Sequence, residues 1–276
     1  MQERKQIEID FGNGTTSTID EKVYSFIVDL QKNPRSLPPF WNLSKSIKNL
    51  NDDFLNFYSY LIKNIRISKS QLYQDLFVLY KLKEKTNGIF LEYGATNGVD
   101  FSNTYLLENK FNWKGVLSEP SNKWHLSLQK NRPNSKILHE CIYSQTGKNL
   151  NFFTSYHSEF STLEEFRYCD KSTMPGNTKD RNYKGYNHEV TSISLNDVFI
   201  KYFNSSPIDY MSVDTEGSEL IILENFDFKK YSPKIVTVEH NFTDTENKLD
   251  MLFTNNNYKR VLKEYTQFDA WYVLRD

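Results

Sequence analysis

The chain lacks the features that mark several special classes of protein. It has only two cysteines, Cys141 and Cys169, among 276 residues, too few for a disulfide framework or a cysteine-ligated zinc site. No apolar run approaches the roughly 18 residues of a membrane span. The N-terminus leads into no apolar stretch of the kind found in signal peptides. We therefore expect no membrane span and a cytoplasmic location.

An excess of charge of either sign is also missing. Lys and Arg together number 34, and Asp and Glu together number 35. Nucleic-acid-binding proteins usually carry a basic excess, so this balance argues against a nucleic-acid partner. Hydrophobic residues make up 38% of the chain and aromatic residues 15%, enough for one large domain with an appendage. A homo-oligomer is compatible with this composition.

The first 68 residues differ from the rest, and we interpret them as an N-terminal helical extension. The first 20 residues are polar and are expected to form an extended or frayed arm. Apolar residues at helical spacing predict a helix over 23–30 and a strongly amphipathic helix over 54–65. The second helix is expected to cover the main domain.

Residues 69–276 alternate predicted strands and helices, the pattern of a doubly wound, mostly parallel, Rossmann-like α/β sheet. Strands are predicted at 89–93, 116–119, 136–142, 151–154, 189–193, 208–213 and 235–239, with two more before residue 274. Helices are predicted at 71–83, 103–109, 195–203 and 247–254. A further helix is predicted to begin near Pro120 and to end at about residue 131. Strands 151–154 and 189–193 are expected to pair.

A long polar insert at 155–188 separates these paired strands. Long loops of this kind are either functional lids or disordered, and we predict a mobile lid that selects a ligand. Its basic residues could hold an anionic ligand such as a nucleotide sugar: Lys171, Lys179, Arg181 and Lys184. Asp170 and Asp180 interrupt this charge, so a solvated face is the alternative.

The most informative motif is the turn Glu92-x-Gly94-x-x-x-Gly98, followed by a strand that ends at Glu119-Pro120. A glycine turn between two strands, the second ending in an acid, indicates a nucleotide-binding unit. Glu119 can accept hydrogen bonds from both ribose hydroxyls. Dinucleotide binding favours G-x-G-x-x-G, but here the middle glycine is missing and Glu92 would repel a phosphate. S-adenosylmethionine carries no phosphate and has a cationic sulfonium and ammonium. The motif therefore favours a methyltransferase over a dinucleotide-dependent oxidoreductase.

Ionisable residues also follow two later strands. Asp214 and Glu216 follow the strand at 208–213, and Glu239 and His240 end the strand at 235–239. Ligands of open α/β sheets bind outside the carboxyl ends of the strands, so these residues predict a functional site at that edge.

Taken as a set, the motifs resemble FkbM-type methyltransferases over roughly residues 68–275. The resemblance implies a class I, S-adenosylmethionine-dependent O-methyltransferase, often acting on sugars or polyketide-like hydroxyls. The matching segments are Ser70-Gln71-x-x-Gln74-Asp75, Phe90-Leu91-Glu92-Tyr93-Gly94-Ala95, Ser102-Asn103-Thr104, Gly115-Val116-Leu117-x-Glu119-Pro120, the run from Ile208 to Glu219, and Val238-Glu239-His240-Asn241.

The turn motif and the resemblance together predict a set of cofactor-binding residues. Asp214 is expected to hold the methionine ammonium, and Cys141 to lie beside adenine as a small apolar residue rather than a nucleophile. The full set is Gln71, Gln74, Asp75, Glu92, Gly94, Ala95, Asn97, Gly98, Ser102, Asn103, Glu119, Pro120, Cys141 and Asp214.

Transfer of a methyl group to a hydroxyl needs a base, and His240 is the candidate by its ordinary pKa. Asp214 and Glu216 complete the predicted catalytic set. If a divalent cation such as Mg²⁺ takes part, Asp214, Glu239 and His240 are its candidate ligands. The expected acceptor is a sugar, a glycan or another small molecule. A non-catalytic nucleotide-binding module stays an alternative, and the neutral charge argues against RNA methylation.

Overall fold

The computed structural model describes residues 6–10, 16–20 and 52–275, and the chain divides into two compact units, Met1–Leu50 and Asn51–Asp276. In the first unit, β1 (Gln6–Asp10) and β2 (Thr16–Asp20) pair antiparallel, where the sequence predicted an extended or frayed arm. The helix predicted at 23–30 lies outside the described residues. No helix in the described part of the chain is long and apolar enough to cross a membrane.

The amphipathic helix of the predicted extension is part of the second unit. This helix is α4 (Asp52–Asn64), and its Phe57 is fully buried. The Phe57 ring lies edge-on to Phe77 at 5.7 Å and to Trp271 at 6.3 Å between centroids. The helix therefore covers the main domain as its pattern predicts, but the units divide after Leu50 rather than at residue 68.

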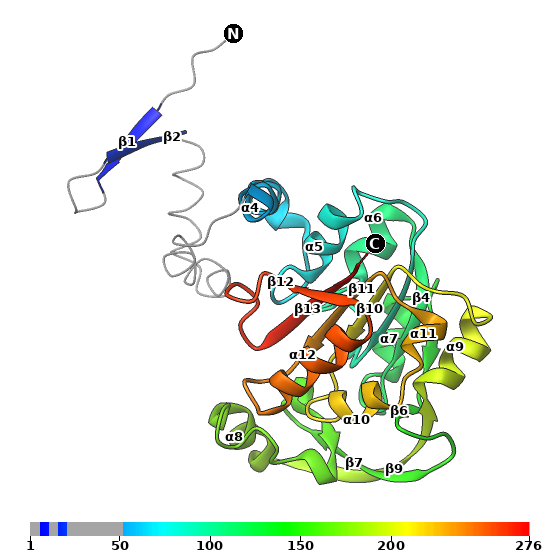
Figure 1. Ribbon diagram of the computed structural model, residues 1–276. Coiled ribbons are helices and arrows are strands. Elements are labelled where there is room, and N and C mark those ends of the chain that lie inside the picture. Colours follow the sequence, from blue (N-terminus) through cyan, green and yellow to red (C-terminus); the bar gives the residue numbers. More distant parts are fainter. Residues whose placement is uncertain (1–5, 11–15, 21–51, 276) are drawn as a thin grey trace. The chain divides into compact units, whose positions relative to one another are not determined.

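The main domain is built on a seven-stranded sheet with the order β12-β13-β11-β10-β3-β4-β5. All neighbouring strands are parallel except β13, which runs antiparallel to both β11 and β12 (Figure 1). This arrangement confirms the predicted doubly wound, mostly parallel sheet. The strands are β3 (Ile89–Tyr93), β4 (Lys114–Ser118), β5 (Lys136–Leu138), β10 (Tyr210–Val213), β11 (Ile235–Glu239), β12 (Tyr258–Val261) and β13 (Asp269–Leu274).

Side chains alternate along each strand, so the sheet presents side chains on both faces. Helices cover each of these faces. On one face, Leu91 and Val213 belong to a core that includes Phe199 and Leu249 from the covering helices. On the other face, the ring of Phe77 lies 4.5 Å from that of Trp271. The helices of the domain after α4 are α5 (Gln74–Lys81), α6 (Tyr105–Phe111), α7 (His125–Asn131), α8 (Pro175–Tyr183), α9 (Leu195–Phe203), α10 (Glu219–Glu224), α11 (Phe228–Tyr231) and α12 (Thr245–Asn255).

A second sheet, with the order β6-β9-β7-β8, stands beside the first. The strand predicted at 136–142 is in fact two strands: β5 stays in the main sheet, and β6 (Cys141–Tyr143) joins the second. The break falls at His139-Glu140, two polar residues between the apolar pairs Ile137-Leu138 and Cys141-Ile142. The predicted pairing of 151–154 with 189–193 is confirmed by β7 (Asn149–Ser155) and β9 (Gly185–Ser194).

The insert between these paired strands is largely structured. It contains β8 (Thr162–Leu163), which pairs with β7, two short 3-10 turns at Ser158–Phe160 and Glu164–Phe166, and the helix α8. In Figure 1, α8 and the outer ends of β7 and β9 lie together at one end of the domain.

Candidate active site

A cavity of about 330 Å³ lies at the carboxyl ends of β3, β4, β10 and β11, the edge at which the sequence predicted a site. Gly94, Glu119, Asp214 and Glu239 line it from the sheet, and Phe160 lines it from the insert. The volume falls within the roughly 300–1,000 Å³ typical of small-molecule sites.

The turn after β3 brings two strands into direct contact. Gly94 has a φ of +82°, and a Cβ added to it would lie 1.8 Å from the carbonyl oxygen of Asp214. Only glycine allows both the positive φ and this approach. The backbone N–H groups of Gly94 and Ala95 both donate to the carbonyl of Ser118, which ties the turn to the end of β4.

Glu119 lies on the cavity wall directly after β4. One carboxylate oxygen accepts a hydrogen bond from the backbone N–H of Thr96, and the other from that of Ser121, each at 2.8 Å. Burial raises the pKa of Glu119 to about 7, against the effect of these two bonds. Pro120 and Cys141 line the same part of the cavity, and burial raises the pKa of the Cys141 thiol to about 12, so this thiol stays protonated.

Glu92 does not reach the cavity, contrary to prediction. Its carboxylate faces the other side of β3, where it accepts bonds from the Ser102 hydroxyl (2.9 Å), the Asn103 backbone (2.7 Å) and the Thr104 hydroxyl. The Arg132 guanidinium lies 3.8 Å away. Glu92 therefore holds the segment at 102–104 against the strand from behind the site.

Three other predicted cofactor contacts, Asp75, Asn97 and Gly98, are also absent from the cavity wall. Asp75 accepts bonds from the Ser68 hydroxyl (2.6 Å) and the backbone of Lys69 and Leu76. Asn97 accepts from two backbone N–H groups of its own turn, and Gly98 lies against α7. Such bonds are the ordinary work of Asp and Asn in caps and turns.

The remaining predicted residues divide between two cavities. Gln71, Ala95 and Ser102 line the main cavity. Gln74 and Asn103 line a much smaller one beside it, where the Gln74 amide donates to Asp269 at 2.9 Å.

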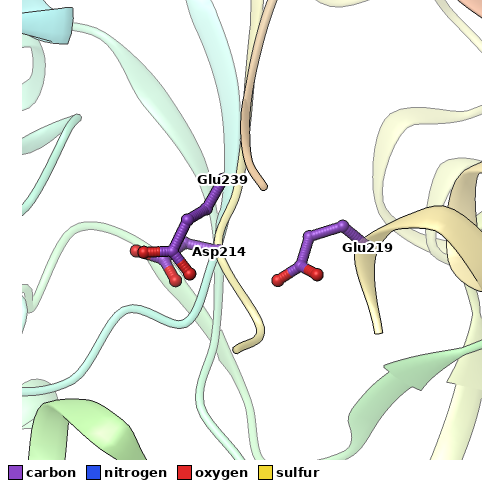
Figure 2. Close-up of side chains that lie close together, drawn as sticks. All are labelled: Asp214, Glu219 and Glu239. Carbon is purple, nitrogen blue, oxygen red and sulfur yellow. The ribbon is translucent and has the colours of Figure 1, made fainter. Parts of the chain in front are cut away.

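Three carboxylates gather where β10 and β11 end. Asp214, Glu219 and Glu239 each present an oxygen, and these oxygens lie within 4.8 Å of one another (Figure 2). Burial, followed by the charges of Glu219 and Asp269, raises the pKa of Asp214 to about 8. Burial also raises the pKa of Glu239 well above its ordinary value. Like charges this close resist simultaneous ionisation, so the group is suited to holding a proton or a cation.

His240 turns away from the main cavity and lines a second cavity of about 210 Å³. Its Nδ1 accepts the backbone N–H of Phe242 at 3.1 Å, and its Nε2 lies 3.2 Å from the carbonyl oxygen of Asp269. The neutral ring must therefore donate from Nε2 and has no free lone pair. Burial lowers its pKa to about 4. This geometry does not fit the predicted general base.

Glu216 lines the main cavity and is paired with the insert. Arg181 of α8 is fully buried, forms an ion pair with Glu216 and a second one with Asp170 at 2.6 Å, and donates to the carbonyl of Phe160. The predicted role of Arg181 in gripping an anionic ligand is wrong, because its guanidinium is used within the protein.

Two residues of the site were not singled out in the sequence. Glu219 stands in the quoted motif but was given no role; its carboxylate accepts from the backbone of Thr215 and Gly217. Asn241 lines the main cavity and donates to Glu239 at 2.8 Å. The sequence held a signal for each residue. Glu219 begins the helix α10 that follows β10, and Asn241 comes two residues after the end of β11.

Comparison with known proteins agrees with these features. Residues 92–271 match the model of the methyltransferase FkbM domain, and the chain belongs to this family of S-adenosylmethionine-dependent methyltransferases. A search of curated proteins found no match.

Several solved structures are similar in part. The plantazolicin methyltransferase BpumL, solved in complex with SAH, is 10% identical over 93% of this chain and 98% of its own, with a TM-score of 0.39. A ribosomal protein L11 methylase from Lactobacillus delbrueckii subsp. bulgaricus is 8% identical over 75% and 78%, with a TM-score of 0.39. A precorrin-6y C5,15-methyltransferase from Geobacter metallireducens GS-15 is 9% identical over 67% and 71%, with a TM-score of 0.38.

Proposed function

We propose that the protein transfers the methyl group of S-adenosylmethionine to a hydroxyl of a sugar or another small molecule. The observation that carries the cofactor half of this proposal is Glu119. Its carboxylate is fixed by two backbone bonds on the cavity wall, at the end of the strand that follows the glycine turn. The cofactor supplies an electrophilic methyl group on a sulfonium, and the protein has to place it and remove a proton from the acceptor.

Replacing Glu119 tests the cofactor site. Glu119→Ala should weaken binding of S-adenosylhomocysteine by about 1.5–3 kcal/mol, the range for hydrogen bonds to a charged group. Calorimetric titration measures this loss. Glu189→Ala, an exposed glutamate on β9, is the matched control and should bind normally. Equal affinity of the Glu119 variant and the control would remove Glu119 from the site.

We propose Glu239 as the general base, with Asp214 beside it, in place of His240. As the acceptor oxygen bonds to the methyl carbon, the sulfur–carbon bond breaks, its electron pair stays on sulfur, and the hydroxyl proton passes to the carboxylate. A buried carboxylate with a raised pKa is a suitable proton acceptor near neutral pH. The amide of Asn241 orients Glu239 at 2.8 Å.

Adjacent residues allow a sharp test of this base. Once an acceptor is in hand, Glu239→Gln should lower turnover by about 10²–10⁴-fold while binding of S-adenosylhomocysteine persists. His240→Gln should keep turnover within a few-fold of wild type. The reverse ranking of the two variants would return the role to His240.

Mg²⁺ remains a proposal for the same site. Asp214, Glu219 and Glu239 are oxygen donors of the kind that hard cations prefer, and their spacing of 4.8 Å or less suits a shared ion. A bound cation would neutralise the group and orient an acceptor oxygen. Calorimetric titration with MgCl₂ tests this: saturable binding in wild type should be lost in Glu219→Gln, and its absence in wild type would end the proposal.

A further inference from the structure

The wall of the main cavity is one-sided in charge. Among the residues that the structure describes, no Lys, Arg or His lines it. Carboxylates, in contrast, come from the turn after β3, from three strand ends and from the insert. They are Asp100, Glu119, Glu159, Asp214, Glu216 and Glu239.

The basic residues of the insert do not offset this charge. Arg181 is divided between Asp170 and Glu216, so its charge is already matched. Lys171, Lys179 and Lys184 are exposed and absent from the cavity wall. Burial raises the pKa of several of these acids, Glu119 to about 7 and Asp214 to about 8, so part of the group is protonated near neutral pH. The wall nevertheless offers an anion no cation, and each acid that ionises adds negative charge.

A second feature of the same wall is a neutral polar group. The hydroxyl of Tyr93 is buried, the residue being 1% exposed, and finds no hydrogen-bond partner. Tyr93 lines the cavity. Burial raises the pKa of this phenol well above its ordinary value, so it is a neutral donor and acceptor. Buried polar groups of this kind usually have a partner, and a ligand hydroxyl or amine can supply one.

From these two observations we infer that the methyl acceptor is uncharged or positively charged at the end that enters the cavity. Phosphate, sulfate and carboxylate groups next to the reacting hydroxyl are excluded. This inference rests on the proposed function, because it concerns the second substrate of the same site. A neutral polyol or an amino-bearing alcohol meets the requirement, and a sugar phosphate does not.

The size of the effect follows from general electrostatics. Clefts lined by one sign of charge with low-dielectric walls can change local ion concentrations by about 10–10³-fold. An anion would in addition lose its hydration against carboxylates that offer no compensating bond. A cationic group is enriched by the same potential that repels the anion.

The potential can be measured without knowing the acceptor. Met174 lines the cavity from the insert, and Lys179 is exposed on α8, the helix that follows it. In a Cys169→Ala background, Met174→Cys and Lys179→Cys each provide a thiol for methanethiosulfonate reagents with a cationic, a neutral or an anionic head group. Rates are followed by mass spectrometry, with and without S-adenosylhomocysteine, and peptide mapping separates the buried Cys141.

The cation-to-anion rate ratio at Met174→Cys should exceed that at Lys179→Cys by about tenfold or more. Adding Glu239→Gln should reduce this excess. Equal ratios at the two positions, or faster reaction of the anionic reagent in the cavity, would overturn the inference. Asn177→Cys, on the same wall, repeats the measurement if Met174→Cys does not fold. Failure of wild type to bind S-adenosylhomocysteine is scored separately and counts against the proposed function.

Discussion

Two fully buried arginines, Arg132 and Arg181, support the site from different sides. Arg132 lies behind the glycine turn, and Arg181 lies in the insert. Arg132, at the end of α7, pairs with Glu108 at 2.7 Å and also donates to the carbonyl of Gly98 and the hydroxyls of Ser102 and Thr104. Its guanidinium lies over the ring of Phe90 in β3, 5.5 Å from the ring centroid. It is part of the frame behind the cofactor turn.

Arg181 holds the insert to the end of β10. Its partners are Asp170, Glu216 and the carbonyl of Phe160, and two of these three lie in the insert itself. Arg132 thus joins elements that cannot separate without unfolding the sheet, whereas Arg181 joins a covering segment to it. Equal burial of the two side chains should therefore have unequal consequences.

The largest effect is expected at Arg132. Arg132→Met leaves Glu108 and Glu92 buried without their cation, and breaking a buried pair in this way typically costs about 3–5 kcal/mol. Urea denaturation should show this loss in the free energy of unfolding. Lys130→Met, an exposed change on the same helix, should stay within about 0.5 kcal/mol of wild type. A loss at Arg132 as small as this control would show that the frame does not depend on the pair.

A smaller global effect is expected at Arg181. In Arg181→Met the insert can open and let Asp170 and Glu216 reach water, so the cost is limited to the free energy of local opening. We expect about 0.5–3 kcal/mol, the usual range for a single substitution, with faster proteolysis confined to residues 156–184. Lys179→Met is the exposed control. If Arg181→Met instead lost as much stability as Arg132→Met, without selective cleavage, the insert and the sheet would be a single cooperative unit.

The smallest effect is expected at Gly176, in the first turn of α8. A Cβ added there meets nothing within 4 Å, so Gly176→Ala should stabilise the insert by about 0.4–1 kcal/mol through the unfolded chain. Cleavage within the insert should slow by roughly two- to fivefold, with the urea midpoint of the sheet nearly unchanged. Faster cleavage would show that α8 does not persist as a helix in solution.

The same division explains what the sequence could predict. The strands and helices of the main sheet follow from local periodicity and strand-end acids, and the glycine at position 94 marks the turn correctly. Glu119 stands where the motif places it. These features are local, because each depends on neighbours within one strand–turn–helix unit.

The errors concern the direction of side chains and long-range pairing. Glu92 lies inside β3, level with Leu117 of β4, whereas Glu119 follows the last residue of β4, so only Glu119 reaches the cavity at the strand ends. Glu239 and His240 are adjacent, and neighbouring residues along a strand point to opposite faces of the sheet, so only Glu239 lines the main cavity. In the sequence, Arg181 does not differ from the other basic residues of the insert. Its ion pairs with Asp170 and Glu216 depend on the tertiary fold. The break between β5 and β6 coincides with the polar pair His139-Glu140, which was included in the predicted strand.

The position of β13 has a consequence for how the protein forms during synthesis. This strand is the last described element in the chain, yet it lies between β11 and β12. Its first residue, Asp269, accepts a bond from Gln74, 195 positions earlier. A growing chain can pair β11, β10, β3 and β4 while still on the ribosome, but β12 has no place in the sheet until residues 269–274 emerge. Contacts of such long sequence separation form slowly. Until then β11 is an open edge that can pair with other chains, so the nascent protein is most exposed to aggregation just before β13 leaves the exit tunnel.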